Sequence, residues 1–158
     1  GKYHYDGHRD CGVYLCPAET RQNNGKCPKC GKALTIGVLN RVEELADRPE
    51  GYVRKDHPPF VTLLPISEVI SSAIGRGIAT KGVWEHYNKL MKLGSEYSVA
   101  LDVPLDELMK ATTPAIAEAI IALREGRVKY IPGYDGVYGK AIILDREGQE
   151  IVLGSDTD

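Results

Sequence analysis

The four cysteines are the feature that most constrains how this chain can fold. No other cysteine occurs in its 158 residues, and the four follow the pattern C-x4-C-x10-C-x2-C as Cys11, Cys16, Cys27 and Cys30. Two close pairs separated by a short excursion can present four thiolates to one tetrahedral Zn²⁺. The spacing therefore predicts a structural zinc site with these four ligands.

The second cysteine pair has the residues of a tight turn around a metal. Pro28 and Gly31 flank a two-residue spacer between Cys27 and Cys30, which favours backbone amides that point at sulfur. Two disulfides are the alternative, but the chain shows no signal peptide and no further cysteine, which favours a reducing, cytoplasmic location. Four sulfur ligands would leave no open position for water, so we expect the zinc to be structural and not catalytic.

Length and composition indicate a globular protein of one domain or two small ones, with 42% hydrophobic and 27% charged residues. No apolar run approaches the ~20 residues of a membrane span. The chain begins with Gly1 and not with Met, so we expect a piece of a longer protein. The net charge is −2, yet residues 1–32 hold six basic and three acidic side chains. This excess weakly favours a phosphate-binding surface, and scattered solvated charge explains it equally well.

Sequence patterns divide the chain into three parts. Residues 1–47 read as a zinc ribbon followed by a helix, because Val38, Val42 and Leu45 recur at helical spacing over 38–47. Residues 48–66 contain Pro58 and Pro59 in a stretch that predicts a loop or hinge. Residues 67–158 form the last part. The fold class expected is small mixed α/β, with a zinc ribbon, a helical middle and a C-terminal β-hairpin carrying a glycine-rich loop.

Apolar spacing and breakers predict the elements of the last part. We expect helices over 67–75, 80–93 and 113–126, the last with Thr113 as cap and Gly126 as terminator. Residues 97–101 read as a strand. A further strand over 128–131 precedes the glycine-rich loop 132–140, and 141–144 with 150–153 predict a hairpin.

A polar triplet precedes the first cysteine. His4, Asp6 and His8 point to one face if this segment is extended, because side chains repeat every second residue. Three interpretations stay open: a second metal site, polar strand decoration, or recognition of a base edge or phosphate by the turn Asp6–Asp10, which also contains Arg9.

The loop 132–140 combines three glycines with two tyrosines and a lysine. Glycines allow close approach to a ligand, and tyrosines can stack on bases. Packing of the tyrosines on the helices is the alternative. The candidate DNA-binding residues here are Gly133, Tyr134, Gly136, Tyr138 and Lys140. The loop lacks GK[ST] and is not a Walker loop. No nucleophile or acid–base constellation appears, so we predict no catalytic residue.

Five stretches together carry a resemblance to a known family. They are Lys2–Cys11, Cys27–Gly31, Leu34–Arg48, Leu123–Gly126 and Pro132–Gly139. The chain resembles the endonuclease Q family over most of its length. In that family an N-terminal PHP-type phosphoesterase domain carries the catalytic metals, a zinc-binding domain and a mostly helical C-terminal region follow, and the enzymes nick DNA 5′ of deaminated bases or abasic sites.

The resemblance implies that this chain is the part that follows the phosphoesterase domain. Its four cysteines match the family's zinc site. We therefore expect a DNA-binding, lesion-recognition fragment that is not catalytic by itself, with damaged DNA and the missing phosphoesterase domain as partners. Asp6, His8, Arg9 and Asp10 would contribute to a base pocket, and the loop from Tyr134 to Lys140 would contact the DNA backbone or the gap left by the base. The alternatives are a zinc-ribbon adaptor that binds proteins and a helicase-associated DNA-binding module.

Overall fold

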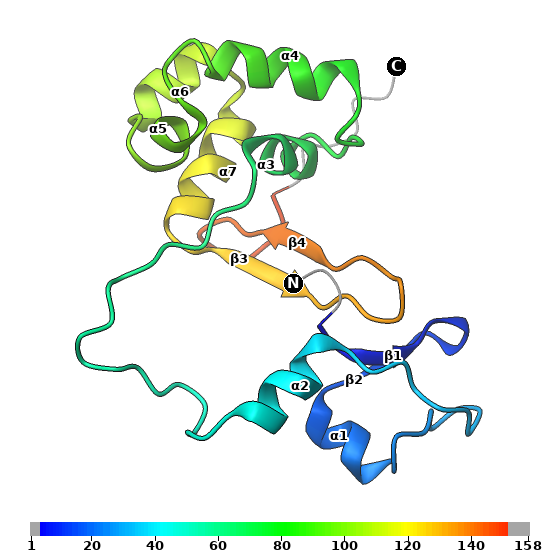
Figure 1. Ribbon diagram of the computed structural model, residues 1–158. Helices are drawn as coiled ribbons and strands as arrows, with labels where there is room; N and C mark the ends of the chain where they lie inside the picture. Colours follow the sequence, from blue (N-terminus) through cyan, green and yellow to red (C-terminus); the bar gives the residue numbers. More distant parts are fainter. Residues whose placement is uncertain (1–3, 152–158) are drawn as a thin grey trace. The chain divides into compact units, whose positions relative to one another are not determined.

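The chain forms two compact units in a computed structural model that describes residues 4–151 (Figure 1). Unit 1 comprises Gly1–Pro59 and Tyr130–Ala141, and unit 2 comprises Phe60–Lys129 and Ile142–Asp158. The boundary at Pro59 falls inside the predicted hinge 48–66, and residues 46–65 contain no helix or strand. Residues 130–141, which the sequence grouped with 67–158, cluster instead with unit 1.

Unit 1 is built on a short antiparallel hairpin. Strand β1 (Asp6–His8) pairs with β2 (Val13–Leu15), and a 3₁₀ turn, η1 (Arg9–Cys11), connects the strands. Gly7 and Thr35 exchange backbone hydrogen bonds of 2.9 and 2.8 Å, which adds the segment after the second cysteine pair to the hairpin. Two helices complete the unit, α1 (Pro17–Gln22) and α2 (Val38–Leu45), and α2 confirms the helix predicted over 38–47.

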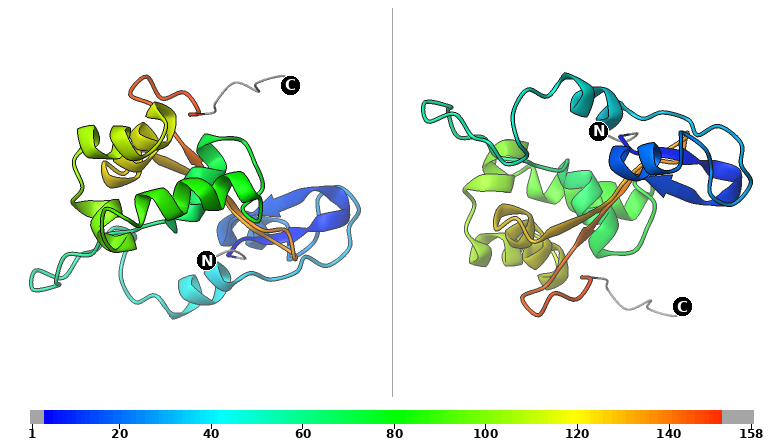
Figure 2. Two further views of the ribbon diagram at one scale, coloured as in Figure 1. Left: turned by 90° about the horizontal axis from the view of Figure 1, so that it is seen from above. Right: turned by 90° about the horizontal axis from the view of Figure 1, so that it is seen from below.

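Unit 2 is a helical domain with one apolar core. Its helices are α3 (Ile66–Ala73), α4 (Lys81–Leu90), α5 (Glu96–Leu101), α6 (Leu105–Ala111) and α7 (Pro114–Arg124). Helix α7 packs against α3, α5 and α6, and Figure 2 shows the helical unit from two further sides. The largest fully buried side chains are Ile66, Ile70, Leu90, Leu108, Ile116, Ile120 and Ile143. Pro114 in the first turn of α7 and Gly126 after its end, at φ 73°, explain why this helix was predicted well.

The strand predicted over 97–101 is wrong, because these residues lie in α5. Ser95 caps this helix by accepting a hydrogen bond from the Ser98 amide at 3.1 Å. Val99 and Ala100 are both buried although they are adjacent, while Tyr97 is 74% exposed. Adjacent burial fits a helix that packs one face into the core and does not fit an alternating strand.

The C-terminal region contains a second two-stranded sheet. Strand β3 (Val128–Ile131) pairs with β4 (Lys140–Ile143). The hairpin turn predicted over 145–149 is present, since the Asp145 amide donates to the Gln149 carbonyl at 2.8 Å and Leu144 bridges Glu150. Residues 152 and 153 of the predicted last strand lie outside the described residues. Within residues 4–151, every helix is too short or too polar to cross a bilayer.

Candidate metal centre

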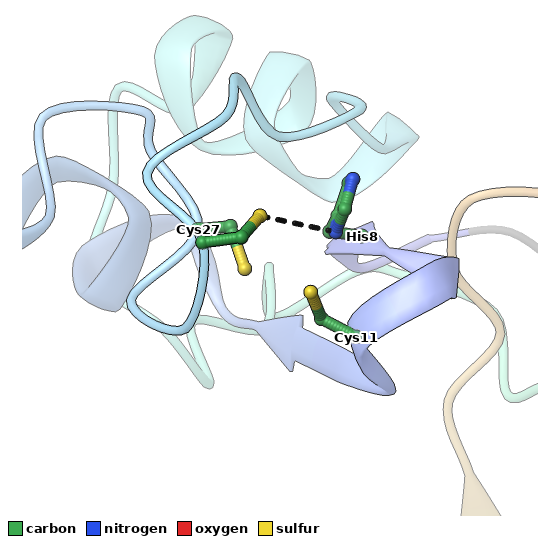
Figure 3. A group of neighbouring side chains, drawn as sticks. His8, Cys11 and Cys27 are labelled. Atoms are coloured by element: carbon green, nitrogen blue, oxygen red, sulfur yellow. Dashed lines mark hydrogen bonds between the residues drawn. The ribbon is translucent and has the colours of Figure 1, made fainter.

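Four side chains of unit 1 converge on one point and form the candidate metal centre. They are His8, Cys11, Cys27 and Cys30, and their ligand atoms all lie within 4.8 Å of one another. The His8 Nδ1 is 3.6 Å from the Cys30 Sγ. Figure 3 shows the His8, Cys11 and Cys27 side chains pointing toward one another from the hairpin and from the loop that follows α1.

Two turns bring these ligands together. His8 ends β1, and η1 returns the chain so that Cys11 lies on the same side, helped by Gly12 at φ 60°. In the second turn, the Cys27 amide donates to the Lys32 carbonyl at 2.7 Å and the Gly31 amide donates to the Cys27 carbonyl at 2.8 Å. Gly31 has φ 73°, a conformation that glycine adopts without steric cost. Each turn thus supplies two ligands separated by two residues.

The surroundings of Cys11 and Cys27 act on their ionisation in opposite directions. Hydrogen bonding to Cys30, burial and the proximity of Cys27 raise the pKa of Cys11 to about 11. Burial also opposes ionisation of Cys27, but hydrogen bonds from the backbone of Cys30 and Lys29 lower its pKa overall. These hydrogen bonds match the amides predicted to point at sulfur. A divalent cation favours the thiolate form of every ligand that it binds.

The donor set fits a metal ion that prefers soft ligands. An ion with bonds of about 2.3 Å to sulfur and about 2.0 Å to nitrogen holds its ligand atoms less than about 4 Å apart in a tetrahedron. The observed cluster is close to that size. Three thiolates and an imidazole occupy all four tetrahedral positions, so the site can stabilise the fold but offers no position for a substrate or a reactive water.

Cys16, which the sequence assigned as a ligand, is not part of the cluster. It is the N-cap of α1, where its amide donates to Glu19 Oε2 at 2.8 Å in a capping box. His8 takes the fourth place in the cluster. The signal was in the sequence, because His8 and Cys11 have the same two-residue spacer as Cys27 and Cys30.

The triplet of His4, Asp6 and His8 does not form a second metal-ligating group among the described residues. Asp6 is fully buried, and its two carboxylate oxygens accept hydrogen bonds from the Gly37 amide at 2.6 Å and from Asn40 Nδ2 at 2.7 Å. Asp6 therefore joins the hairpin to the start of α2. Buried in this way, it cannot present its carboxylate to a base.

The glycine-rich loop 132–140 is attached to the hairpin of β1 and β2, which carries two residues of the candidate metal centre. The Gly133 carbonyl accepts from the His4 and Tyr5 amides at 3.2 and 3.1 Å. Asp135 accepts from the Arg9 amide at 2.6 Å and from the Thr35 hydroxyl at 2.7 Å. These bonds join the loop to the hairpin across more than 90 residues of sequence, so the two predicted binding segments share one body.

The tip of this loop is a two-residue turn. Tyr134 and Val137 exchange backbone hydrogen bonds of 3.0 and 2.6 Å, and the residues between them, Asp135 and Gly136, both have positive φ. This is the backbone of a type I′ turn, for which Asp-Gly is a preferred sequence. The turn holds the Asp135 carboxylate toward Arg9 and Thr35.

We expect Asp135→Asn to destabilise unit 1 by about 1–3 kcal/mol, because asparagine tolerates the turn but accepts with only one oxygen. The hydrogen bonds from the Arg9 amide and the Thr35 hydroxyl lower the pKa of Asp135. The stabilisation is therefore complete above the unfolded-state pKa of about 4 and is lost as the pH falls through the folded-state value. Denaturation of the wild type and of Asp135→Asn at several pH values measures the difference in their free energies of unfolding. A difference that is the same at every pH would contradict the prediction.

The remaining predicted DNA-binding residues differ in exposure. Arg9, Asp10, Gly136, Tyr138 and Lys140 are exposed, with Tyr138 at 62%. Gly133 is buried and Tyr134 is half-buried.

The Tyr134 ring packs on the hairpin. It lies 5.3 Å from the Tyr14 ring, and a side chain at Gly7 would overlap Tyr134. Tyr134 thus positions the loop, and Tyr138 is the tyrosine of the loop that presents a large surface.

Both the sequence and the structure of this chain are similar to those of known proteins. Residues 65–127 match the family model described as the MJ0043 C-terminal domain. The protein MJ0043 of Methanocaldococcus jannaschii is 41% identical over 143 residues, which cover 89% of this chain and 18% of that protein.

Two crystal structures resemble nearly the whole chain. The lesion-specific endonuclease PfuEndoQ from Pyrococcus furiosus has a TM-score of 0.76 and 35% identity, over 91% of this chain and 36% of that one. Endonuclease Q in complex with a 27-mer duplex substrate with an abasic lesion at the active site has a TM-score of 0.75 and 33% identity, over 96% of this chain and 38% of that one.

The hairpin unit with its candidate metal centre and the helical unit are together similar to part of two endonuclease structures. This likeness to endonuclease Q confirms the resemblance predicted from the sequence. The chain spans less than a fifth of the curated relative and little more than a third of each endonuclease Q chain.

Proposed function

We propose that this chain is the DNA-binding, lesion-recognition part of an endonuclease Q-type repair enzyme and that it performs no catalytic step by itself. The observation that carries the proposal is its likeness to an endonuclease Q solved with a duplex that contains an abasic lesion. The match covers 38% of that chain, which leaves room for a separate cutting domain such as the phosphoesterase domain implied by the resemblance.

The metal proposed for the cluster is zinc. Three thiolates and one imidazole are a ligand set typical of structural zinc sites. When bound, zinc would supply folding energy and no reaction chemistry. DNA recognition would then depend on the side chains of this chain. His8 and Cys11 would fix the turn that carries Arg9 and Asp10.

The proposed DNA surface lies on the metal-binding hairpin and the loop that Asp135 holds to it. Arg9 and Lys140 are exposed cations suited to phosphates, and the Arg9 guanidinium lies beside Gly136, whose lack of a side chain leaves the turn accessible. Asp10 can accept hydrogen bonds from a base edge. A damaged base leaves the stack at a cost of a few kcal/mol, less than an intact pair requires. The exposed Tyr138 can enter the gap that the extruded base leaves, or it can stack on a neighbouring base.

The test is equilibrium binding of the purified chain to a duplex with one abasic site and to the same duplex undamaged, at two salt concentrations. We expect tighter binding to the damaged duplex, and weaker binding to both at higher salt because phosphate contacts release counterions. The proposal would be contradicted by an affinity that is the same for both duplexes and at both salt concentrations, or by no binding. Either result would favour a protein-binding adaptor.

Tyr138→Ala is expected to weaken binding to the damaged duplex by about 1–3 kcal/mol, the range for loss of one stacked aromatic side chain. Tyr138 is 62% exposed, so metal content and melting temperature should stay unchanged. Tyr97→Ala is the matched control, because Tyr97 is 74% exposed in unit 2 and is no part of the proposed surface. Equal affinities of the two variants would remove Tyr138 from the proposed surface.

A further inference from the structure

Unit 2 contains an open groove that is lined by more basic than acidic side chains. It has a volume of about 670 Å³ and is lined by Lys89, Lys92, Leu93, Glu107, Lys110 and Ala111. The residues come from the last turn of α4, from the segment directly after it and from α6, and the two helices contact each other (Figure 1). Three lysines face a single glutamate here, although the whole chain has a net charge of −2. Such a local excess of one sign marks a surface for an oppositely charged partner.

The cations of the groove are available to a ligand. All three lysines are exposed, and among the described residues neither Lys89 nor Lys92 forms an ion pair. Lys110 lies 3.5 Å from Asp106, with both side chains more than 70% exposed. An exposed pair of this kind is weak and can be exchanged for a stronger anion.

The apolar lining and the core beneath it fix the shape of the groove. Leu90 of α4 and Leu108 of α6 are fully buried, which anchors both walls in the core of unit 2. His86 Nδ1 and the Thr112 hydroxyl are hydrogen-bonded at 2.9 Å, which joins α4 to the end of α6. Leu93 and Ala111 give the lysine stems an aliphatic surface, so the ammonium groups can extend toward solvent.

The neighbouring histidine adds no charge of its own at neutral pH. Burial, and then the positive charge of Lys89, lower the pKa of His86, while Glu85 acts weakly in the opposite direction. The groove therefore owes its positive character to its lysines. A lysine contributes a mobile point charge, which suits the phosphates of a backbone better than the fixed pattern of a base edge.

We propose that the groove between α4 and α6 binds the phosphate backbone of the DNA duplex as a second contact, in addition to the surface of the metal-binding hairpin. This inference rests on the proposed function, because it takes DNA as the ligand. It assigns the helical unit a role in affinity without lesion specificity, since phosphate contacts carry no base information.

The test compares two double variants in the full chain. Lys92→Gln with Lys110→Gln removes one charge from each wall of the groove. The control, Lys55→Gln with Lys81→Gln, removes the same charge elsewhere, and Lys81 has an exposed i,i+4 partner, Glu85, as Lys110 has in Asp106. All four substitutions are at exposed positions, so melting temperatures should stay close to wild type.

The groove variant should bind both the abasic and the undamaged duplex more weakly. The slope of log affinity against log salt should become shallower by about 0.9 for each lost phosphate contact, which corresponds to about eightfold per contact at 0.1 M salt relative to 1 M. The ratio of the affinity for the abasic duplex to that for the undamaged duplex should be the same in the groove variant as in the wild type. Glu107→Gln should act in the opposite direction and tighten binding, because it removes the one acidic side chain of the groove.

The outcomes separate the two claims. If wild type distinguishes the lesion and the groove variant keeps the affinity and the salt slope of the control, the inference is wrong and the proposed function stands. If the groove variant loses lesion preference instead of general affinity, the groove is no backbone contact. If wild type binds neither duplex, the proposed function fails and this inference fails with it.

Discussion

Cys27→Ser is expected to abolish metal binding and to unfold unit 1. Cys27 is 2% exposed, and with Val13 and Leu34 it makes up the small buried apolar cluster of this unit. A cluster of this size cannot hold the unit folded without an ion. Structural zinc supplies on the order of 10–16 kcal/mol in small zinc-binding peptides, and loss of one thiolate removes most of it. Elemental analysis and amide exchange of residues 4–45 measure both effects.

Two further variants decide which residue is the fourth ligand. His8→Ala should lose the metal as Cys27→Ser does. Cys16→Ser should keep one metal per chain and the stability of wild type, because serine is a preferred N-cap residue for α1. Loss of the metal in Cys16→Ser, with retention in His8→Ala, would show that the ligand set is the four cysteines and not the cluster described above.

Asp6→Ala is expected to destabilise unit 1 by about 3–5 kcal/mol. The carboxylate is fully buried and accepts two short hydrogen bonds, from the Gly37 amide and from Asn40 Nδ2. Bonds to a charged acceptor contribute about 1.5–3 kcal/mol each, and alanine leaves both donors unpaired in the interior. The connection between the hairpin and α2 is thereby lost.

The measurement for Asp6→Ala has to follow unit 1 separately. The single tryptophan, Trp84, lies in α4, so its fluorescence reports on unit 2. Rates of thiol modification in denaturant report on unit 1. Asp10→Ala is the control, because Asp10 is exposed on the same turn and should change stability by less than about 0.5 kcal/mol. Equal stability of the two variants would mean that the buried carboxylate holds nothing together.

Local signals explain what the sequence predicted correctly. The spacing of Cys11, Cys27 and Cys30 identified three members of the cluster, because turns around a metal need short, fixed spacers. Helix α7 was predicted because Pro114, the apolar spacing and Gly126 are local signals that lie in one short stretch of sequence. The prediction of a strand over 97–101 was wrong because apolar residues in so short a run fit a strand and a helix equally. The N-cap at Ser95 favours the helix.

Long-range contacts explain what the sequence could not predict. The bond from the Arg9 amide to Asp135 spans 126 residues, and no pattern near either residue indicates the other. Asp6 illustrates the same limit. Its position in the triplet His4, Asp6 and His8 left a metal site, polar decoration and base recognition open, but its partners Gly37 and Asn40 lie more than 30 residues away, and it is buried. His8 was considered for base recognition because the cysteine pattern alone already supplied four ligands.

The most direct test is the DNA affinity of the wild-type chain before and after its metal is removed by a chelator. If an ion in the cluster of His8, Cys11, Cys27 and Cys30 organises the surface that recognises the lesion, the metal-free protein will lose its preference for the abasic duplex while unit 2 stays folded. One equivalent of Zn²⁺ will restore the preference. Undiminished lesion preference in the fully metal-free protein would contradict the account.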